Sequence, residues 1–158
     1  MSKKNEMKRQ EYPLLEDFLW QAIDVPEGMD PPPRSILHTP ALQVYLAGFG
    51  GNRSDQAFVA EIDGRVVGAA WARIMKDYGH IDAHTPSLAI SVWKEFRGRG
   101  IGSALVRALL ESLKKSGYSR VSLSVQRANP ARRMYERAGF RIFEQRGEEY
   151  LMIAHLTD

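Results

Sequence analysis

The sequence predicts one mixed α/β domain over residues 1–158, and three observations lead to this expectation. The chain has the length of one average domain, and 44% of its residues are hydrophobic, which is enough for a sizeable core. Apolar residues recur at helical spacing in some segments and form short strand-like runs in others. Neither an internal repeat nor a low-complexity tract divides the sequence. We expect N-terminal helices and a loop in residues 1–55, followed by a sheet-forming core in residues 56–154.

The N-terminal part is predicted to be mostly helical. Residues 1–10 are charged and expected to fray, whereas apolar side chains at helical spacing predict an amphipathic helix over residues 11–23. Residues 26–40 contain five prolines and are expected to form a semi-rigid loop. Thr39 and the proline after it then begin a second short helix that ends near Phe49.

The pattern next changes to strands. Residues 57–62 and 66–74 have the composition of two strands, and the Asp-Gly pair between them predicts a tight hairpin turn. A polar loop over residues 76–86 leads into a third strand, which is predicted over residues 88–92.

The last third of the chain alternates helices and strands. A helix over residues 100–115 has its apolar side chains on one face and is followed by Gly117, a common helix terminator. Asn129 and Pro130 predict the start of a second helix, with the asparagine as its cap, that runs to residue 138. The remaining strands are predicted at residues 121–125, 140–143 and 150–153.

The net charge of +3 is unevenly distributed along the chain. Residues 1–93 carry a net charge of −3, residues 94–146 carry +9, and the remaining residues carry −3. A segment this basic favours an anionic partner, which could be nucleic acid, a membrane surface or a phosphorylated ligand. A solvated helix face is the other interpretation, and charge alone leaves these alternatives open.

Composition excludes several classes of chemistry. The chain has no cysteine, which rules out a disulfide framework, a thiolate zinc site and a covalent cysteine intermediate. His80 and His84 have the spacing of a zinc pair on a helix, but they fall in a predicted loop, so we expect no metal. No window approaches the roughly 20 apolar residues of a membrane span, and residues 1–10 lack the apolar stretch of a signal peptide. We expect a cytoplasmic protein without a membrane partner.

The most informative stretch is residues 88–102, where a buried strand runs into a glycine-rich loop and then into a helix. Glycine at every second position from 98 to 102 lets the backbone turn tightly, and the free N–H groups of the first helical turn can hold phosphate oxygens. Arg97 and Arg99 add mobile positive charge at the same place. A Walker A loop would need a lysine before Ser103, and the glycine spacing also differs from the dinucleotide-binding fingerprint.

Two blocks of this sequence carry a resemblance to a known family. The first is Arg97-Gly98-Arg99-Gly100-Ile101-Gly102, which matches a pyrophosphate loop of the form Gln/Arg-x-x-Gly-x-Gly/Ala, together with the strand end from Val92 that precedes it. The second is an asparagine followed by a helix ending Tyr-x-x-x-Gly-Phe, matched by Asn129, Tyr135, Gly139 and Phe140. In this order, the blocks are similar to those of the GNAT superfamily of acyl-CoA-dependent N-acetyltransferases. The resemblance covers residues 56–154.

The resemblance implies the acyl-CoA N-acyltransferase fold, an α/β fold with a centrally splayed sheet flanked by helices. The strands at 88–92 and 121–125 would separate, and acetyl-CoA, the acyl donor, would enter the gap. Unpaired strand edges inside a sheet are costly unless a ligand satisfies them, and the two amides of a pantetheine arm can do so. The N–H near Val92 would stabilise the oxyanion of the reaction. The implied cofactor-binding residues are Ile90, Ser91, Val92, Arg97, Gly98, Arg99, Gly100, Ile101, Gly102, Ser103, Asn129, Arg132 and Tyr135.

Two features depart from the family pattern. Asn129 precedes Tyr135 by six residues, where seven is more usual, which affects its expected contact with the pantetheine arm. The family's first strand is also not recognisable before Glu11. We expect that strand to be short, shifted into residues 4–10, or missing.

The resemblance also implies direct attack of an amine on acetyl-CoA within a ternary complex. Tyr135 matches the family's general acid, since a hydroxyl of ordinary pKa about 10 can protonate a leaving thiolate of ordinary pKa about 8.5. A purely structural core tyrosine is the alternative interpretation. Four residues are candidates for the general base, and none is singled out: Glu61, Asp82, His84 and Glu95.

The acceptor amine is open at this stage. The loop over residues 26–40, the second helix and the loop over residues 76–86 would form the acceptor wall. Their acidic side chains favour a cationic small amine or a lysine-bearing peptide; these are Asp24, Glu27, Asp30, Asp77 and Asp82. A CoA-binding domain without catalysis and a basic nucleic-acid-binding module are the rival functions. We expect no nucleic acid partner, because no aromatic-interleaved pattern accompanies the basic helix, and a monomer or homodimer.

Overall fold

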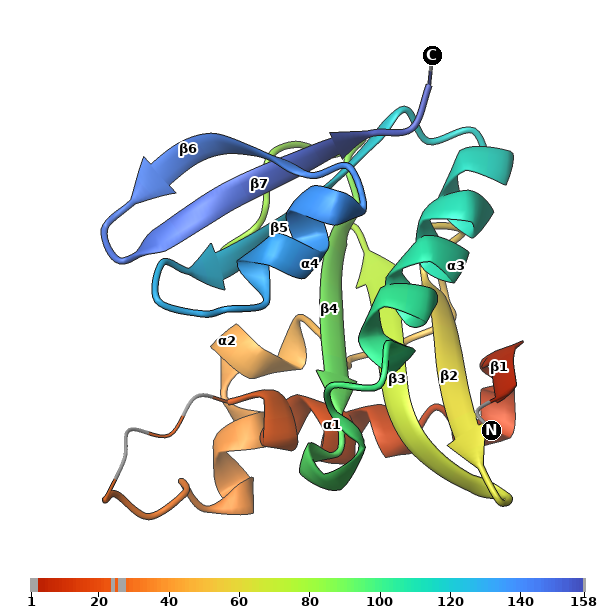
Figure 1. The fold of residues 1–158 in the computed structure, drawn as a ribbon, viewed down its shortest axis with the longest axis vertical. Coiled ribbons are helices and arrows are strands. Elements are labelled where there is room, and N and C mark those ends of the chain that lie inside the picture. The colour runs from red at the N-terminus through yellow and green to blue at the C-terminus, as the bar shows by residue number, and fades with distance from the viewer. Residues whose placement is uncertain (1–2, 24, 26–27, 158) are drawn as a thin grey trace.

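One mixed sheet forms the centre of the computed structural model, which describes residues 3–23, 25 and 28–157 (Figure 1). Its strands are β1 Lys3–Glu6, β2 Gln56–Ile62, β3 Arg65–Arg73, β4 Ser87–Val92, β5 Arg120–Gln126, β6 Arg141–Arg146 and β7 Glu149–His155. Across the described residues the strand order is β1-β2-β3-β4-β5-β7-β6. Neighbours pair antiparallel except β4 and β5, which run parallel at the centre of the sheet.

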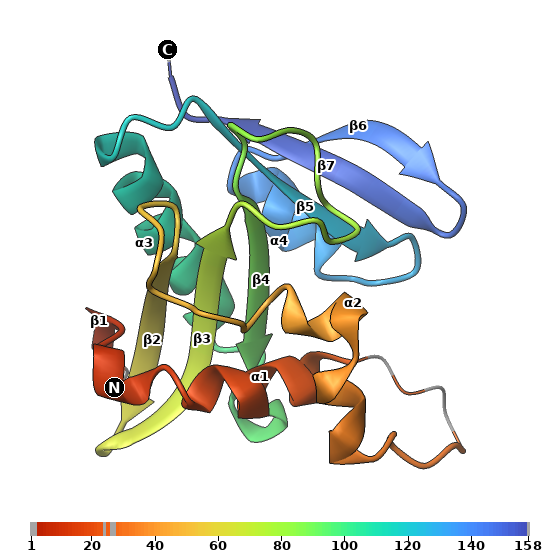
Figure 2. The same cartoon turned by 180° about the vertical axis from the view of Figure 1, so that it is seen from behind.

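Helices cover both faces of this sheet. They are the 3₁₀ helices η1 Arg9–Glu11, η2 Arg34–His38 and η3 Lys94–Phe96 and the α-helices α1 Leu14–Ala22, α2 Pro40–Gln43, α3 Ile101–Lys115 and α4 Arg132–Arg137. Helices α3 and α4 lie on one face, which we call the α3 face (Figure 1). Helices α1 and α2 lie on the opposite face, the α1 face (Figure 2). Within the described residues, no helix is long and apolar enough to cross a membrane.

The α3 face is held by an amphipathic helix. Leu105, Leu109 and Leu113, four residues apart on one side of α3, are completely buried against the sheet. Burial of a leucine side chain contributes roughly 1.5–3 kcal/mol, so this stripe alone fixes α3 over β2 and β3. Phe140, which follows α4, is buried in the same cluster and anchors that helix.

A second core lies on the α1 face. Leu15 and Phe18 of α1 are buried against Trp71 of β3. The Phe18 ring also lies 5.4 Å from the ring of Trp93, which follows β4. Because α1 covers the first half of the sheet, the other half of the α1 face is left to α2 and to the loop between β3 and β4 (Figure 2).

The two central strands separate, as predicted from the resemblance. β4 and β5 share one register pair, Ser87 with Ser122, which lies at the beginning of β4. From there to their carboxyl ends the strands diverge (Figure 1). The predicted fold class, a centrally splayed mixed sheet flanked by helices, is therefore confirmed.

Several predicted boundaries differ from the observed ones. A four-residue strand, β1, exists before Glu11 and pairs with β2. The predicted second helix is shorter, because α2 ends at Gln43 and turns continue the chain toward Phe49. The predicted loop over residues 26–40 contains η2, while Pro26 and the acidic residues Asp24 and Glu27 lie outside the described residues. The last two strands are longer than predicted. Backbone pairing extends β6 along solvent-exposed residues without an apolar pattern, and it extends β7 from Glu149 to His155.

Candidate active site

The glycine-rich loop brings free backbone N–H groups to the start of α3. Gly98 and Gly100 have φ angles of 78° and 80°, in the left-handed region where a side chain is strained. The first helical bond of α3 runs from the N–H of Ala104 to the carbonyl of Gly100, at 3.1 Å. The N–H groups of Ile101, Gly102 and Ser103 therefore precede the helical ladder, and no acidic residue occupies the first turn. This end of α3 suits an anion.

The two arginines of the loop are held by backbone carbonyls. Arg97 donates from Nε to the carbonyl oxygen of Val92 at 3.0 Å, which joins the loop to the end of β4. Arg99 donates to the carbonyl of Glu95 at 3.4 Å, and its guanidinium lies 5.3 Å from the ring centroid of Phe96. The side chains of Arg97 and Arg99 were expected to be mobile, but each is held by one hydrogen bond to a backbone carbonyl near the start of α3.

The alternation of hydrogen bonds shows which backbone groups line the gap between β4 and β5. Trp93 donates to Val67 of β3 at 2.8 Å, so odd-numbered residues of β4 pair with β3 and the N–H groups of Ile90 and Val92 are directed toward β5. On β5, the N–H of Arg127 donates to the carbonyl of Glu148 at 2.8 Å, so the odd-numbered residues pair with β7. The backbone N–H and C=O groups of the even-numbered residues are therefore directed toward β4. Because the strands diverge, these two edges face each other across an open gap.

Burial varies along β4 where the two strands diverge. Ser87 and Leu88 at its beginning and Ser91 and Val92 at its end are buried, whereas residues 89 and 90 between them are partly exposed. A strand in the middle of a sheet is normally least exposed at its centre, so this reversal marks the opening. The Ser91 hydroxyl, in a residue that is 5% exposed, has no hydrogen-bond partner within the described residues.

Tyr135 lies on α4 at the α3 face of the gap. The residue is 8% exposed, and its ring packs edge-on against Phe140 with the centroids 6.0 Å apart. Burial raises the pKa of Tyr135 to about 12, so its hydroxyl keeps its proton at neutral pH. A Cβ added to Gly102 would lie 3.4 Å from both Ile90 and Met134, which shows that β4, α3 and α4 meet at this point.

Asn129 and Arg132 lie at the beginning of α4. The helix starts at Arg132, three residues after the predicted cap, because the Asn129 carboxamide accepts a bond from the N–H of Ala131 at 2.9 Å and forms a local turn first. Arg132 pairs with Glu136 at 3.8 Å, and its guanidinium lies 5.2 Å from the ring centroid of Tyr150. Arg132 is thus the first residue of α4, and Asn129 forms the turn that precedes it.

The four candidate bases from the sequence lie away from the opening. Glu61 on β2 is opposite Lys3 of β1, at the far edge of the sheet, and Glu95 is exposed on η3. His84 is exposed in the β3–β4 loop. A backbone bond from His84 and side-chain bonds from Thr85 and Arg120 lower the pKa of Asp82 to about 2, which makes it a poor proton acceptor.

Sequence reasoning did not single out Asp77 as a candidate for proton transfer. Its carboxylate accepts bonds from the Ser87 hydroxyl at 2.9 Å and from the N–H of Gly79 at 3.1 Å. Burial raises the pKa of Asp77, and the bonds from Ser87, from the backbone and from Tyr45 offset part of that rise. No local motif marks this residue, because its surroundings come from the turn after α2, the β3–β4 loop and β4.

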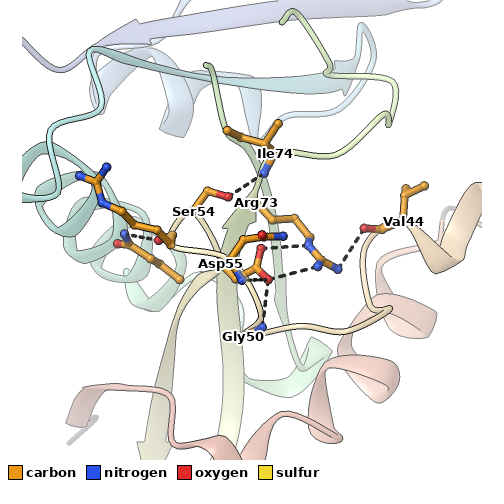
Figure 3. A network of polar contacts seen from close by, with 9 residues as sticks. Val44, Gly50, Ser54, Asp55, Arg73 and Ile74 are labelled. Atoms are coloured by element: carbon orange, nitrogen blue, oxygen red, sulfur yellow. Dashed lines mark hydrogen bonds and ion pairs between the residues drawn. The ribbon is translucent and has the colours of Figure 1, made fainter. Parts of the chain in front are cut away.

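A buried ion pair fixes residues 44–55, the segment that contains Tyr45 (Figure 3). Arg73 of β3 binds Asp55 through Nε and Nη2, both at 3.1 Å, and the side chains are 8% and 1% exposed. Asp55 accepts a further bond from the N–H of Gly50 at 3.0 Å, and Arg73 donates to the carbonyl of Val44 at 3.2 Å. The chain from residue 44 to residue 55 is therefore tied to the sheet.

Comparison with known proteins assigns the arrangement to a family. A model of the GNAT acetyltransferase family matches residues 16–140. An uncharacterized N-acetyltransferase of Methanocaldococcus jannaschii is 33% identical over 132 residues, which cover 81% of this chain and 78% of the relative. An N-alpha-acetyltransferase of Sulfurisphaera tokodaii is 35% identical over 115 residues, or 63% of this chain and 68% of the relative.

The same fold occurs in solved structures. An N-acetyltransferase from Thermoplasma acidophilum in complex with coenzyme A superposes with a TM-score of 0.72 at 16% identity, over 98% of this chain and 99% of that one. Because the family model spans most of the sequence and the Methanocaldococcus relative matches four fifths of it, this chain belongs to the GNAT acetyltransferase family and is an N-acetyltransferase.

Proposed function

We propose that the acyl donor is acetyl-CoA, held in the gap between β4 and β5. The single observation that carries this proposal is the divergence of β4 and β5 after Ser87 and Ser122, which leaves the N–H groups of Ile90 and Val92 directed toward β5 without a strand partner. Unpaired backbone groups in a sheet are costly, and a ligand with amide groups can satisfy them in the manner of an added strand. The N–H groups on this edge also suit the oxyanion that develops when a thioester carbonyl is attacked.

The diphosphate of the donor would lie at the N-terminus of α3. The free N–H groups of Ile101, Gly102 and Ser103 point out of the helix there, and the charges of Arg97 and Arg99 are held beside them. Arg132 and Asn129, at the start of α4, would flank the path of the adenosine end and the pantetheine arm. A small polyanionic ligand accounts for this part of the basic segment better than a nucleic acid does.

Tyr135 is the residue that we assign as the general acid. The nitrogen of the amine forms a bond to the acetyl carbon, the carbon–sulfur bond breaks with its electron pair on sulfur, and the Tyr135 hydroxyl protonates that sulfur. Its pKa of about 12 keeps the proton in place until a thiolate develops. The absence of cysteine supports direct transfer in a ternary complex, because the chain has no thiol to carry the acetyl group.

The acceptor is proposed to be a cationic primary amine, either a small molecule or a lysine-bearing peptide. Acidic side chains of the described acceptor-side segments, among them Asp30 and Asp77, support this choice. We further propose that residues 1–158 act as one catalytic domain in the cytoplasm, since a chain without cysteine suits a reducing compartment.

Titration calorimetry with acetyl-CoA, followed by thiol release with a panel of amines, tests this function. The panel would hold spermidine, a lysine-containing peptide and a peptide with a free N-terminal alanine. We expect saturable acetyl-CoA binding, a concentration-dependent rise in Tm and turnover of at least one amine. Acetyl-CoA binding without turnover would indicate a non-catalytic domain. Salt-sensitive nucleic acid binding that CoA does not displace would instead favour the nucleic-acid module.

A further inference from the structure

The carboxylate of Asp77 lies where the gap between β4 and β5 begins. It accepts a bond from the hydroxyl of Ser87, the first residue of β4, and Ser87 is also the residue that pairs with Ser122 of β5. Ser122 in turn donates to the carbonyl of Gly79 at 2.6 Å, so the loop that carries Asp77 rests on β5. The carboxylate is therefore bound to β4, and its loop is bound to β5, at the point from which the strands diverge.

This carboxylate is on the α1 face, opposite the predicted donor site. Leu88 and Val92 of β4 pack with α3, so the alternate residues Ser87, Ala89 and Ser91 project to the α1 face. Figure 2 shows the β3–β4 loop crossing β5 on the same side as α1 and α2. With acetyl-CoA held from the α3 face, the attacking amine must arrive from the α1 face.

The distance along β4 indicates proton transfer through water. The N–H of Ile90, the nearer of the two N–H groups that suit the oxyanion, is three residues after Ser87, or about 10 Å along a strand. We therefore expect a short chain of waters between the amine nitrogen and the Asp77 carboxylate. The buried hydroxyl of Ser91, on the same face and nearer the oxyanion donors, has no partner among the described residues and is a further acceptor for an amine hydrogen bond.

The surroundings of Asp77 are built from several elements. Tyr45 is close enough to Asp77 for each to shift the pKa of the other, and Tyr78 and Glu149 further raise the pKa of Tyr45. Arg146 of β6 donates to the carbonyl of Tyr78 at 3.4 Å, which ties the loop to the β6–β7 hairpin. Asp77 and Glu149 thus contribute negative charge to the surroundings of Tyr45, which favours an ammonium group there.

The ion pair of Arg73 and Asp55 holds Tyr45 in position. Arg73 binds the carbonyl of Val44, the residue directly before Tyr45, and its guanidinium lies 5.4 Å from the ring centroid of Phe49 (Figure 3). A buried bidentate pair of this kind is rigid, so the tyrosine reaches Asp77 from a fixed backbone.

We propose that Asp77 attracts the ammonium group of the acceptor and accepts its proton through water, with the Ser87 hydroxyl and the N–H of Gly79 orienting the carboxylate. This inference rests on the proposed function, since it concerns the acceptor half of the same reaction. The ammonium transfers one proton to the carboxylate, which yields a neutral amine and a carboxylic acid that later returns the proton to solvent. The neutral nitrogen attacks the acetyl carbon. As the thiolate takes the proton of Tyr135, the second nitrogen proton replaces it on the tyrosine.

Electrostatics agrees with this role. Burial raises the pKa of Asp77 above its ordinary value, whereas the hydrogen-bonded Asp82 of the same loop is held at about 2. The groups that act on Asp77 are Ser87 of β4, the N–H of Gly79 and Tyr45 after α2; Glu149 and Tyr78 act on Tyr45, and Arg146 of β6 binds the carbonyl of Tyr78, the next residue. The carboxylate must be ionised to act, so kcat is lost as pH falls through the raised pKa.

The variant Asp77→Asn tests the inference with the amine that the wild type turns over fastest. The carboxamide can still accept the bonds from Ser87 and Gly79, so the loop is retained while the proton acceptor is removed. We expect kcat at saturating substrates to fall about 100- to 1000-fold and its acid limb to disappear. The acetyl-CoA Kd should stay within about twofold, because Asp77 is on the other face of the sheet.

Two further variants make the result specific. Asp63→Asn removes the same charge in the exposed β2–β3 turn, at a left-handed φ of 51° that asparagine tolerates, and should leave kcat unchanged. Tyr45→Phe removes a hydroxyl that lowers the pKa of Asp77, so the acid limb should move to higher pH.

The outcomes separate this inference from the proposed function. If the wild type binds acetyl-CoA but acetylates no amine of the panel, the proposed function fails and the role of Asp77 fails with it. If the wild type is active while Asp77→Asn keeps its acid limb, Asp77 is not the proton acceptor, whatever the loss in rate. Should Asp77→Asn not fold, an unshifted acid limb in Tyr45→Phe overturns the inference.

Discussion

The two faces of the gap are built in different ways. The α3 face, where the donor is proposed to bind, uses backbone N–H groups of β4 and α3 and two short stretches of sequence, residues 90–103 and 129–140. The α1 face uses side chains that are far apart in the sequence, such as Tyr45, Asp77 and Glu149. Backbone recognition suits a ligand that every family member shares, whereas side-chain recognition can change with the acceptor.

The largest effect is expected from breaking the buried ion pair on the α1 face. Arg73→Met leaves Asp55 buried without its partner, which should cost about 3–5 kcal/mol in the free energy of unfolding. The exposed pair of Arg34 with Asp17 offers a control, since Arg34→Met should cost about 1 kcal/mol or less. Urea unfolding measures both values.

The same variant also sharpens the comparison of the faces. Where Arg73→Met is still folded, kcat/KM for the amine should fall because Tyr45 loses its support, while the Kd for acetyl-CoA stays unchanged. A parallel loss of acetyl-CoA affinity would mean that the two faces are not independent.

The next largest effect should come from Tyr135→Phe on the α3 face. Removing the hydroxyl should lower kcat about 100-fold at an unchanged Kd for acetyl-CoA, because the ring still packs against Phe140. Tyr118→Phe, near the far end of α3, is the matched control and should retain activity. With a pKa of about 12, the wild-type Tyr135 stays protonated, so kcat should show no basic limb from it below about pH 11. Full activity of Tyr135→Phe would leave the tyrosine a structural role.

The comparison also explains what the sequence could predict. The glycine spacing and the block from Asn129 to Phe140 are local in sequence. They indicated the family, and the family resemblance in turn predicted the splayed sheet. Asp77 could not be found in this way, because its environment depends on Ser87 and Tyr45, which only the fold brings together. The sequence left the first strand open between short, shifted and missing for a related reason: the four residues of β1 are all exposed and polar, and they pair with β2 through backbone bonds.

A smaller effect is expected from a change in the glycine-rich loop. Gly100→Val forces a β-branched side chain into a φ of 80°, and relieving the strain of about 1–3 kcal/mol would turn the loop amides away from the ligand. We expect acetyl-CoA affinity to fall roughly 10- to 100-fold by calorimetry. Gly64→Val is a matched control, because Gly64 has a φ of 79° in the exposed β2–β3 turn. An equal loss of affinity in both variants would mean that general destabilisation, rather than the loop, is responsible.

The smallest effect concerns pH and Asp82. Hydrogen bonds from His84, Thr85 and Arg120 lower its folded-state pKa to about 2, below the value of about 3.9 in an unfolded chain. A carboxyl whose pKa is lowered by folding stabilises the protein above its unfolded pKa, and this contribution disappears as pH falls from about 4 through about 2. Asp82→Asn should therefore lower Tm slightly at pH 7 and converge with the wild type near pH 2. The ion pair of Asp82 with Arg120 lies at the surface, so 1 M NaCl should reduce the difference in Tm between Asp82→Asn and the wild type at pH 7. The same salt should leave the loss of unfolding free energy in Arg73→Met nearly unchanged, because that pair is buried.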